Sequence, residues 1–149
     1  MVLVLANHLY RTHTLLIANH LVLMAFFGLV SVGLFTYLGR PGKITSVRLY
    51  ASVSLYFLLG MLWFALYTFL NAIQPGSFAE AGVVLAGRMQ PSKILYFSLA
   101  TLTTLGYGDI VAIRPPARMF ATLEAAAGVL YIAITVARLV ASYQITNRE

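Results

Sequence analysis

The sequence predicts an all-α membrane protein with the order span, span, re-entrant helix followed by an extended strand, and span. Of the 149 residues, 60% are hydrophobic and 9% are charged, whereas a soluble domain carries about 25% charged residues. The apolar residues also gather into three long stretches, and a helix needs about 20 such residues to cross a bilayer. These two observations exclude a soluble single-domain enzyme and a disordered chain.

The three long stretches mark the expected spans. The first covers residues 15–38 and ends at the turn 39–43, which holds two glycines, a proline and two cations. The second runs over about 47–73 and is rich in aromatic residues, and the third runs over about 117–143 and contains Glu124. A carboxylate inside a span is costly and is usually paired or functional.

Charge and residue types restrict the function further. The net charge of +6 comes from basic residues scattered at the edges of the spans, so we expect no nucleic-acid partner. The chain has no cysteine, no His-Glu-x-x-His pattern and no paired carboxylates, so we expect neither an enzyme nor a cofactor. We interpret the spacing of His8, His13 and His20 as chance rather than as a metal or proton site.

The segment between the second and third spans is unusual. A loop over residues 77–89 precedes an apolar run over about 92–103, which is too short to cross the bilayer and is typical of a re-entrant helix. The next residues, 104–108, alternate glycine with larger side chains. Irregular backbone at membrane depth is tolerated where it is buried in protein or lines a watery path. We therefore expect this strand to face such a path.

The strand at 104–108 has a composition suited to binding cations. Glycine adopts backbone angles that other residues avoid, so Gly106 and Gly108 allow successive carbonyls to turn toward one side. Four such strands around an axis would stack rings of carbonyl oxygens that replace the hydration shell of an ion. Thr104 adds a ring of hydroxyls, and the preceding helix directs its negative C-terminal dipole toward the same axis.

Residues 101–109, Thr-Leu-Thr-Thr-Leu-Gly-Tyr-Gly-Asp, resemble the selectivity-filter signature of potassium channels. The resemblance implies a passive, K⁺-selective channel that works as a homotetramer in the lipid of the cell membrane, of the prokaryotic two-span pore class. It places K⁺ sites at Thr104, Leu105, Gly106 and Tyr107, and Gly108 completes the filter. Leu105 departs from the usual valine, but it contributes a carbonyl, so selectivity is expected to persist.

The resemblance extends beyond the filter and implies a domain organisation. Residues 1–43 carry an extra span with no counterpart in the minimal pore, and residues 146–149 form a tail. The pore domain covers residues 44–145, with an outer helix at about 45–73, a pore helix at about 92–103, the filter at 104–108 and an inner helix at about 116–144.

The family resemblance also sets the expected orientation, with the filter facing outward. Basic residues divide five against five between the two sides, so they do not decide it. Three spans then place the N-terminus outside. We therefore interpret residues 1–14 as an interfacial helix or the stump of an upstream helix, which would make the chain a fragment of a longer protein.

Several residues around the filter are expected to support it. Tyr96 and Phe97 lie where related channels carry an aromatic cuff. Ala100 replaces a glutamate that pairs with the filter aspartate in some channels, so we expect Asp109 to pair with Tyr96 of its own or a neighbouring subunit. The other expected supporting residues are Thr101, Thr103 and Glu124.

Glu124 and the inner helix leave alternatives open. We place Glu124 behind the filter, near the pore-helix threonines or Arg118, with a protonated or snorkelling surface carboxylate as the alternative. Gly128 matches the gating-hinge glycine of the family. Helical spacing then puts a stripe of apolar residues on the inner pore wall, unless it is a plain packing stripe: Val129, Ile132, Val136 and Val140.

The gating stimulus is not encoded in a recognisable motif. Basic residues at every third position are absent, so we expect no voltage-sensing helix, and tension, pH, lipids or control at the filter stay open. Two other functions also stay open: a non-selective cation channel of the same fold, and an accessory subunit that does not conduct alone.

Overall fold

The structure, a computed structural model, describes residues 2–40, 45–85, 87 and 89–146. Within them, helices dominate and three short strands form one small sheet. The helices are α1 (Val2–Gly39), α2 (Ser46–Ile73), α3 (Pro91–Leu102) and α4 (Pro115–Thr146). The strands are β1 (Phe78–Glu80), β2 (Val83–Val84) and β3 (Ile110–Ala112).

The predicted order of spans is confirmed. Three segments are long and apolar enough to cross a membrane, namely Leu15–Gly39, Ser46–Ile73 and Pro115–Arg138. The 12 residues of α3 rise only about 18 Å, because an α-helix advances about 1.5 Å per residue. A helix of that length cannot span. The α1 helix runs without interruption from Val2 into the first span, so its N-terminal part does not form a separate interfacial helix.

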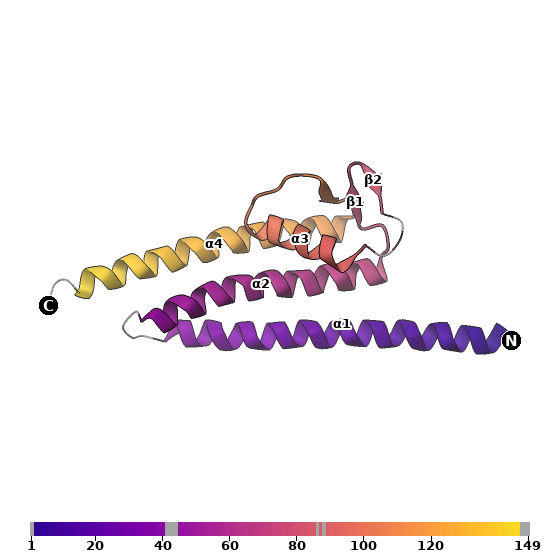
Figure 1. Cartoon of the computed structure of the whole chain (residues 1–149), viewed down its shortest axis with the longest axis horizontal. Coiled ribbons are helices and arrows are strands. Elements are labelled where there is room, and N and C mark those ends of the chain that lie inside the picture. The colour runs from indigo at the N-terminus through magenta and orange to yellow at the C-terminus, as the bar shows by residue number, and fades with distance from the viewer. Residues whose placement is uncertain (1, 41–44, 86, 88, 147–149) are drawn as a thin grey trace.

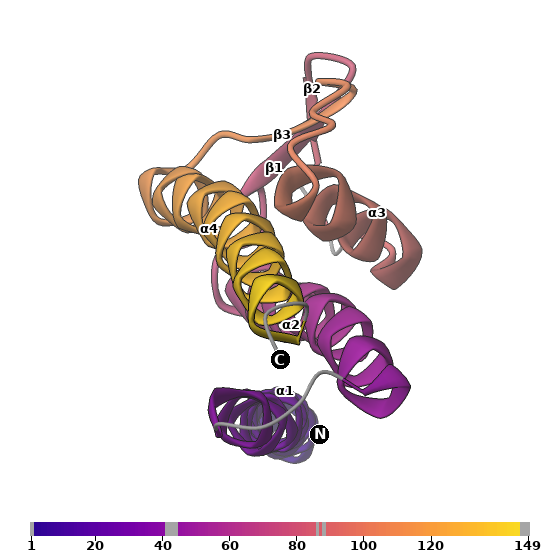
Figure 2. The same ribbon diagram turned by 90° about the vertical axis from the view of Figure 1, so that its left-hand side faces the viewer.

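The long helices lie side by side and alternate in direction. In Figure 1, α1 and α2 run antiparallel, and α4 returns antiparallel to α2. The short α3 and the strands gather where α2 ends and α4 begins, and we call this the filter end. Viewed along the helices, α1 lies outside α2 and α4 and far from the sheet (Figure 2). The N-terminus of α1 is at the filter end, and α4 finishes at the opposite end.

A three-stranded antiparallel sheet occupies part of the segment that we predicted to be a loop. Its strand order is β2-β1-β3, with Ala79 opposite Val84 on one side and Val111 on the other. The loop prediction for residues 77–89 is therefore wrong. The strands have two or three residues each, which is too short to show an alternation of apolar and polar residues. In addition, β3 follows α3 in the chain and so lies far from β1 in the sequence.

An aromatic core fixes α3 against α2 and the sheet. Tyr67 of α2, Phe78 of β1 and Phe97 of α3 are buried and meet edge to face, with ring centroids 5.1 to 5.8 Å apart. Edge-to-face pairs contribute about 0.5–1.5 kcal/mol beyond their buried area. Trp63, one turn earlier in α2, stacks on Tyr67. This core positions the re-entrant helix.

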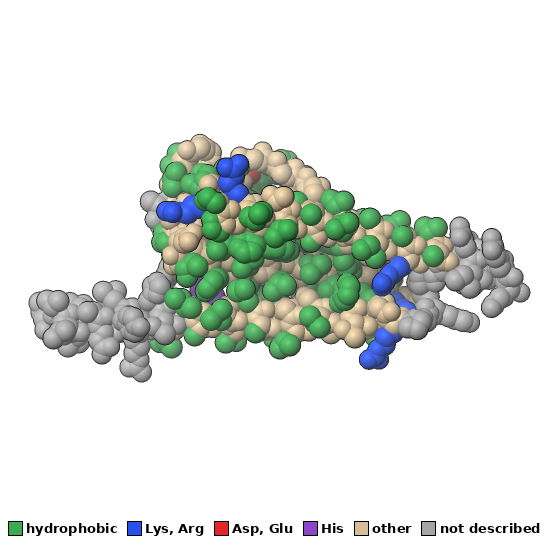
Figure 3. All heavy atoms as spheres, turned by 180° about the vertical axis from the view of Figure 1, so that it is seen from behind, with side chains coloured by type: hydrophobic (Ala, Val, Ile, Leu, Met, Phe, Trp, Pro, Cys, Tyr) green, Lys and Arg blue, Asp and Glu red, His purple; other side chains and the backbone are tan. Residues whose placement is uncertain are grey.

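The surface is apolar along the helices and basic toward the ends. Figure 3 shows hydrophobic side chains along the flank of the helices, with Lys and Arg toward its two ends. This distribution is the one that a bilayer requires, because apolar side chains face lipid and charged ones reach the headgroups.

Candidate functional site

The predicted filter is held by backbone hydrogen bonds to the last turn of α3. The carbonyl of Ala100 accepts from the amides of Leu105 at 2.8 Å and Gly106 at 3.2 Å. The amide of Thr104 donates to the carbonyl of Thr101 at 2.9 Å. These bonds satisfy carbonyls that a helix end otherwise leaves without partners. They also place residues 103–109 directly beyond the negative end of the α3 dipole.

Backbone angles alternate along the filter segment. Thr104, Gly106 and Gly108 have φ of 57°, 53° and 78°, whereas Leu105 and Tyr107 between them have negative φ. The left-handed conformation costs a residue other than glycine about 1–2 kcal/mol, which explains glycine at two of the three positions. Alternation in the sign of φ allows successive carbonyls to turn toward the same side. The segment can therefore present a row of oxygens to one axis.

The filter segment is uncovered in a single chain. Residues 103–109 are all exposed, and Tyr107 retains 70% of its accessible surface. A single chain therefore does not enclose this segment.

The two adjacent aromatic residues of α3 have different roles. Phe97 packs in the aromatic core, whereas the phenol of Tyr96 donates a 3.1 Å hydrogen bond to Oδ1 of Asp109. The structure thus contains the expected partner of Asp109, within one chain. Partial desolvation and this hydrogen bond raise the pKa of Tyr96 above the usual 10.0.

The predicted supporting threonines bond to their own helix. Thr101 and Thr103 each donate a 2.7 Å hydrogen bond to a carbonyl four residues earlier, those of Phe97 and Leu99. Their hydroxyls therefore help to close the C-terminal turn of α3. Neither bonds to Glu124.

Glu124 is buried between three helices at 0% exposure. Its Oε2 accepts a 2.7 Å hydrogen bond from the phenol of Tyr67, and its Oε1 lies 2.6 Å from Oγ of Ser98. Ser98 also lies 2.9 Å from the carbonyl of Gly60. The alternative of a snorkelling surface carboxylate is therefore wrong.

The expected neighbours of Glu124 were also wrong. Its partners are Ser98 and Tyr67, not the pore-helix threonines or Arg118. Neither partner was predicted, because Ser98 and Tyr67 lie 26 and 57 residues away from Glu124 in the chain. Which side chains meet depends on how each helix is rotated about its axis, and the apolar pattern here is too uniform to define that rotation.

Gly128 is the contact point between α4 and the end of α3. A Cβ at this position would fall far inside van der Waals contact with the carbonyl oxygen of Leu102. The absence of a side chain thus lets α4 approach the turn that carries the filter. The α4 helix passes through Gly128 without a break.

The predicted stripe on α4 faces away from its own chain. Its four members each retain about half of their accessible surface: Val129, Ile132, Val136 and Val140. Other α4 residues, such as Leu130 and Ile134, are equally exposed. Among the described residues, no cluster of His, Asp and Glu could hold a metal ion.

Comparison with known families identifies the chain. Residues 44–144 match the family model described as ion channel, which covers more than half of the sequence. The chain belongs to this ion-channel family. No curated protein and no solved structure matches it significantly.

Membership fixes the broad function of this channel. The match begins next to the start of α2 and ends close to the end of α4, so the whole re-entrant arrangement lies within it. The channel is a multi-pass membrane protein that conducts ions, with the two-span pore organisation expected from the sequence. The α1 helix lies outside the match.

Proposed function

We propose that four copies of this channel form a pore that conducts K⁺ passively and selects it over Na⁺. The alternating φ of Thr104 to Gly108 carries the proposal, because it can direct successive carbonyls toward one axis. The Thr-x-Gly-Tyr-Gly pattern at the same residues supports K⁺ as the ion.

The filter residues then act through their backbone. The carbonyls of Thr104, Leu105, Gly106 and Tyr107 replace the water around K⁺, and the Thr104 hydroxyl completes the inner site. Partial negative charge at the C-terminus of α3 favours the cation in the adjoining cavity. No formal charge is needed on the path, which agrees with the shortage of acidic residues.

The other predicted residues take supporting roles. We infer that Tyr96 and Asp109 hold the outer end of the filter, that Glu124 fixes α3 behind it, and that Gly128 lets α4 close on it. The apolar stripe from Val129 to Val140 then lines the inner pore, where a hydrophobic constriction can gate by dewetting. In this proposal the filter faces outward, the protein resides in a prokaryotic cell membrane, and residues 44–145 form the pore domain.

Flux through purified protein in liposomes tests the proposal. We expect K⁺ flux well above Na⁺ flux, and four copies per particle. Gly106→Ala is expected to abolish flux, because a Cβ is strained at a φ of 53°. Gly39→Ala is the matched control, since a Cβ there meets nothing within 4 Å, and its flux should be unchanged.

Each alternative function predicts a different result. Equal K⁺ and Na⁺ flux would identify a non-selective cation channel. An intact particle of the chain alone that passes neither ion would point to an accessory subunit. A stoichiometry other than four would contradict the tetramer.

A further inference from the structure

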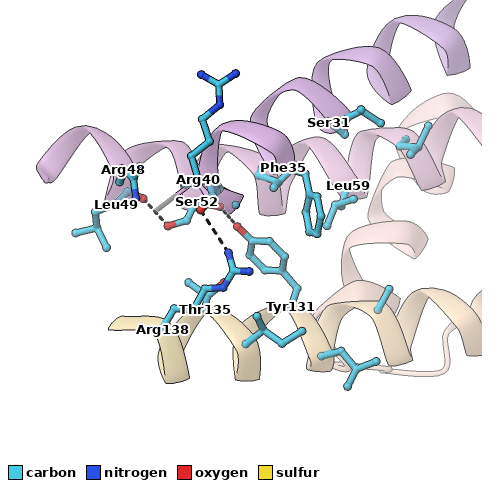
Figure 4. Close-up of a pocket in the computed structure, with 18 of the residues that line it drawn as sticks. Ser31, Phe35, Arg40, Arg48, Leu49, Ser52, Leu59, Tyr131, Thr135 and Arg138 are labelled. Atoms are coloured by element: carbon cyan, nitrogen blue, oxygen red, sulfur yellow. Dashed lines mark hydrogen bonds between the residues drawn. The ribbon is translucent and has the colours of Figure 1, made fainter. Parts of the chain in front are cut away.

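The helices α2 and α4 meet differently at their two ends. Away from the filter end they line, together with α1, a cavity of about 830 Å³ (Figure 4). Tyr131 of α4 lies at this cavity and donates a 2.6 Å hydrogen bond to the carbonyl of Ser52 in α2. Toward the filter end the packing is closer, because Glu124 of α4, Tyr67 of α2 and Ser98 of α3 are each 0% exposed. The contacts of Glu124 therefore join three helices in a closed part of the fold.

The hydroxyl of Ser98 has two close oxygen neighbours but only one proton. Its Oγ lies 2.9 Å from the carbonyl oxygen of Gly60 and 2.6 Å from Oε1 of Glu124. A carbonyl oxygen only accepts hydrogen bonds, and so does an ionised carboxylate. If Glu124 were ionised, the Ser98 proton would serve one of these two contacts, and the other would bring two acceptors together without a proton. An ionised Glu124 thus leaves the three oxygens one proton short.

A proton on Oε1 of Glu124 gives every group a partner. Oε1 then donates to Oγ of Ser98, and the Ser98 hydroxyl donates to the carbonyl of Gly60. Oε2 accepts the 2.7 Å hydrogen bond from the phenol of Tyr67. The chain of hydrogen bonds starts at Tyr67 in α2, passes through α4 and α3, and returns to α2 about two turns earlier. A buried network of this kind rigidifies the packing when every member is satisfied.

The surroundings of Glu124 also favour a neutral group. Its two hydrogen-bond partners, Tyr67 and Ser98, are uncharged hydroxyls. The ion pair that the described residues form joins Lys93 to Glu80 and does not involve Glu124. A charge inside a span is costly unless it is paired or meets water. The carboxylic acid therefore suits this position better than the carboxylate.

We propose that Glu124 positions α3 as an un-ionised carboxylic acid, whose proton links α4 to Ser98 and through it to the Gly60 carbonyl. Ser98 then acts as a positioning residue for the filter. It lies two residues before Ala100, whose carbonyl accepts hydrogen bonds from two amides of the filter segment. The effect on conduction rests on the proposed function, whereas the proton on Glu124 does not depend on it.

Infrared difference spectroscopy of the full chain detects this proton directly. An un-ionised carboxyl group has a carbonyl stretch that a carboxylate lacks, and the chain has only four Asp and Glu residues. In dodecyl maltoside, which has no carbonyl group, the spectrum of wild type minus that of Glu124→Gln should contain this stretch at neutral pH. The matched control is Glu80→Gln, which removes the carboxylate paired with Lys93. Its difference spectrum should lack the stretch.

Ser98→Ala provides a second infrared test that keeps Glu124 in place. The acid then loses the acceptor of its proton, so the stretch should move to higher frequency. Absence of the stretch from the wild type, or a frequency that Ser98→Ala leaves unchanged, would overturn the proposal.

Amide exchange of residues 103–106 measures how firmly α3 holds the filter segment, because these amides bond to carbonyls of α3. Tyr67→Phe should speed this exchange about fivefold, and Ser98→Ala, which breaks two contacts, about 25-fold. Tyr131→Phe is the matched control, since it removes a hydrogen bond between the same two helices at the cavity. Its exchange should equal that of the wild type. Equal effects of the two tyrosine variants would contradict the positioning role.

Potassium flux in liposomes separates this inference from the proposed function. Glu124→Gln keeps a donor for Ser98 and an acceptor for Tyr67, so it should restore most of the flux that Glu124→Ala loses. Equal loss in both variants would show that conduction needs the carboxylate and would overturn the inference. If the wild type itself passes no ions, the proposed function fails, while the infrared and exchange results still decide the state of Glu124.

Discussion

The phenol of Tyr67 donates a 2.7 Å hydrogen bond to the buried carboxyl group of Glu124. Ser98 approaches the other oxygen of the same group at 2.6 Å. One carboxyl group thereby joins α2, α3 and α4. Buried polar networks specify one packing arrangement when all members are satisfied. This contact therefore holds α3, the helix that leads into the proposed filter.

Glu124→Ala should destabilise the protein by about 2–5 kcal/mol, because it creates a cavity and leaves the buried hydroxyl of Tyr67 without a partner. Glu124→Gln should cost under about 1.5 kcal/mol, since its carbonyl can accept from Tyr67 while its amide donates to Ser98. Chemical unfolding in detergent measures both. If the glutamine variant were as unstable as the alanine variant, Glu124 would not stabilise the protein through this hydrogen-bond network.

Tyr67 and Glu124 should also be coupled. In a double-mutant cycle that combines Tyr67→Phe with Glu124→Gln, the coupling free energy should be about 0.5–3 kcal/mol. This is the range for groups in one hydrogen-bond network. Thr68→Ser is a suitable control on α2, because the Thr68 hydroxyl bonds to the carbonyl of Phe64 in its own helix. That control should show no coupling to Glu124.

Gly128→Ala should destabilise the protein by about 1–3 kcal/mol, since the added methyl group forces α4 away from the Leu102 carbonyl. Gly33→Ala in α1 should be neutral or stabilising by about 0.5–1 kcal/mol, because a Cβ there meets nothing within 4 Å and alanine favours a helix. Thermal unfolding of the two variants distinguishes packing from general helix propensity. Equal effects would exclude the close approach at Gly128 as the cause.

Tyr96→Phe should loosen the filter without lowering global stability much, because the hydrogen bond to Asp109 is exposed. Amide exchange of residues 105–110, followed by mass spectrometry, should be faster in the variant at neutral pH. The raised pKa of Tyr96 means that the proton is bound more tightly in the folded state. The stabilising contribution is thus complete below pH 10 and is lost as pH rises through the folded pKa.

The difference in exchange between wild type and Tyr96→Phe should accordingly narrow above pH 10. Tyr50→Phe on the exposed side of α2 is the control and should leave residues 105–110 unaffected at every pH. If the difference in exchange persisted above pH 10, the hydroxyl proton of Tyr96 would not be its cause.

The ion pair between Lys93 and Glu80 joins the start of α3 to β1, at 2.5 Å between Nζ and Oε2. Both side chains are more than a third exposed, so solvent screens the pair. A double-mutant cycle with Lys93→Gln and Glu80→Gln should give about 0.2–1 kcal/mol. In 1 M salt, where the screening length falls to about 3 Å, the coupling should largely vanish. Coupling that is insensitive to salt would contradict this account.

Much of the fold could be predicted from the sequence because membrane structure depends on local composition. Residues 15–38 and 47–73 are apolar over bilayer length, which by itself requires helices there. The apolar run before Gly106 is too short to span the bilayer, and this predicted a re-entrant helix there. The Tyr96–Asp109 contact was predicted from the resemblance to potassium channels, because Ala100 replaces the glutamate that pairs with the aspartate in some of them.

The sequence by itself thus determined the number of spans, the re-entrant helix and the positions of Gly106 and Gly108, since each depends on chain length in lipid or on backbone angles. The tertiary structure alone decided the partners of Glu124, the role of Gly128 against Leu102, the small sheet and the cavity beside α1. These features depend on the rotation and approach of helices that are far apart in the chain. Helices that are apolar on all sides carry no pattern that fixes either one.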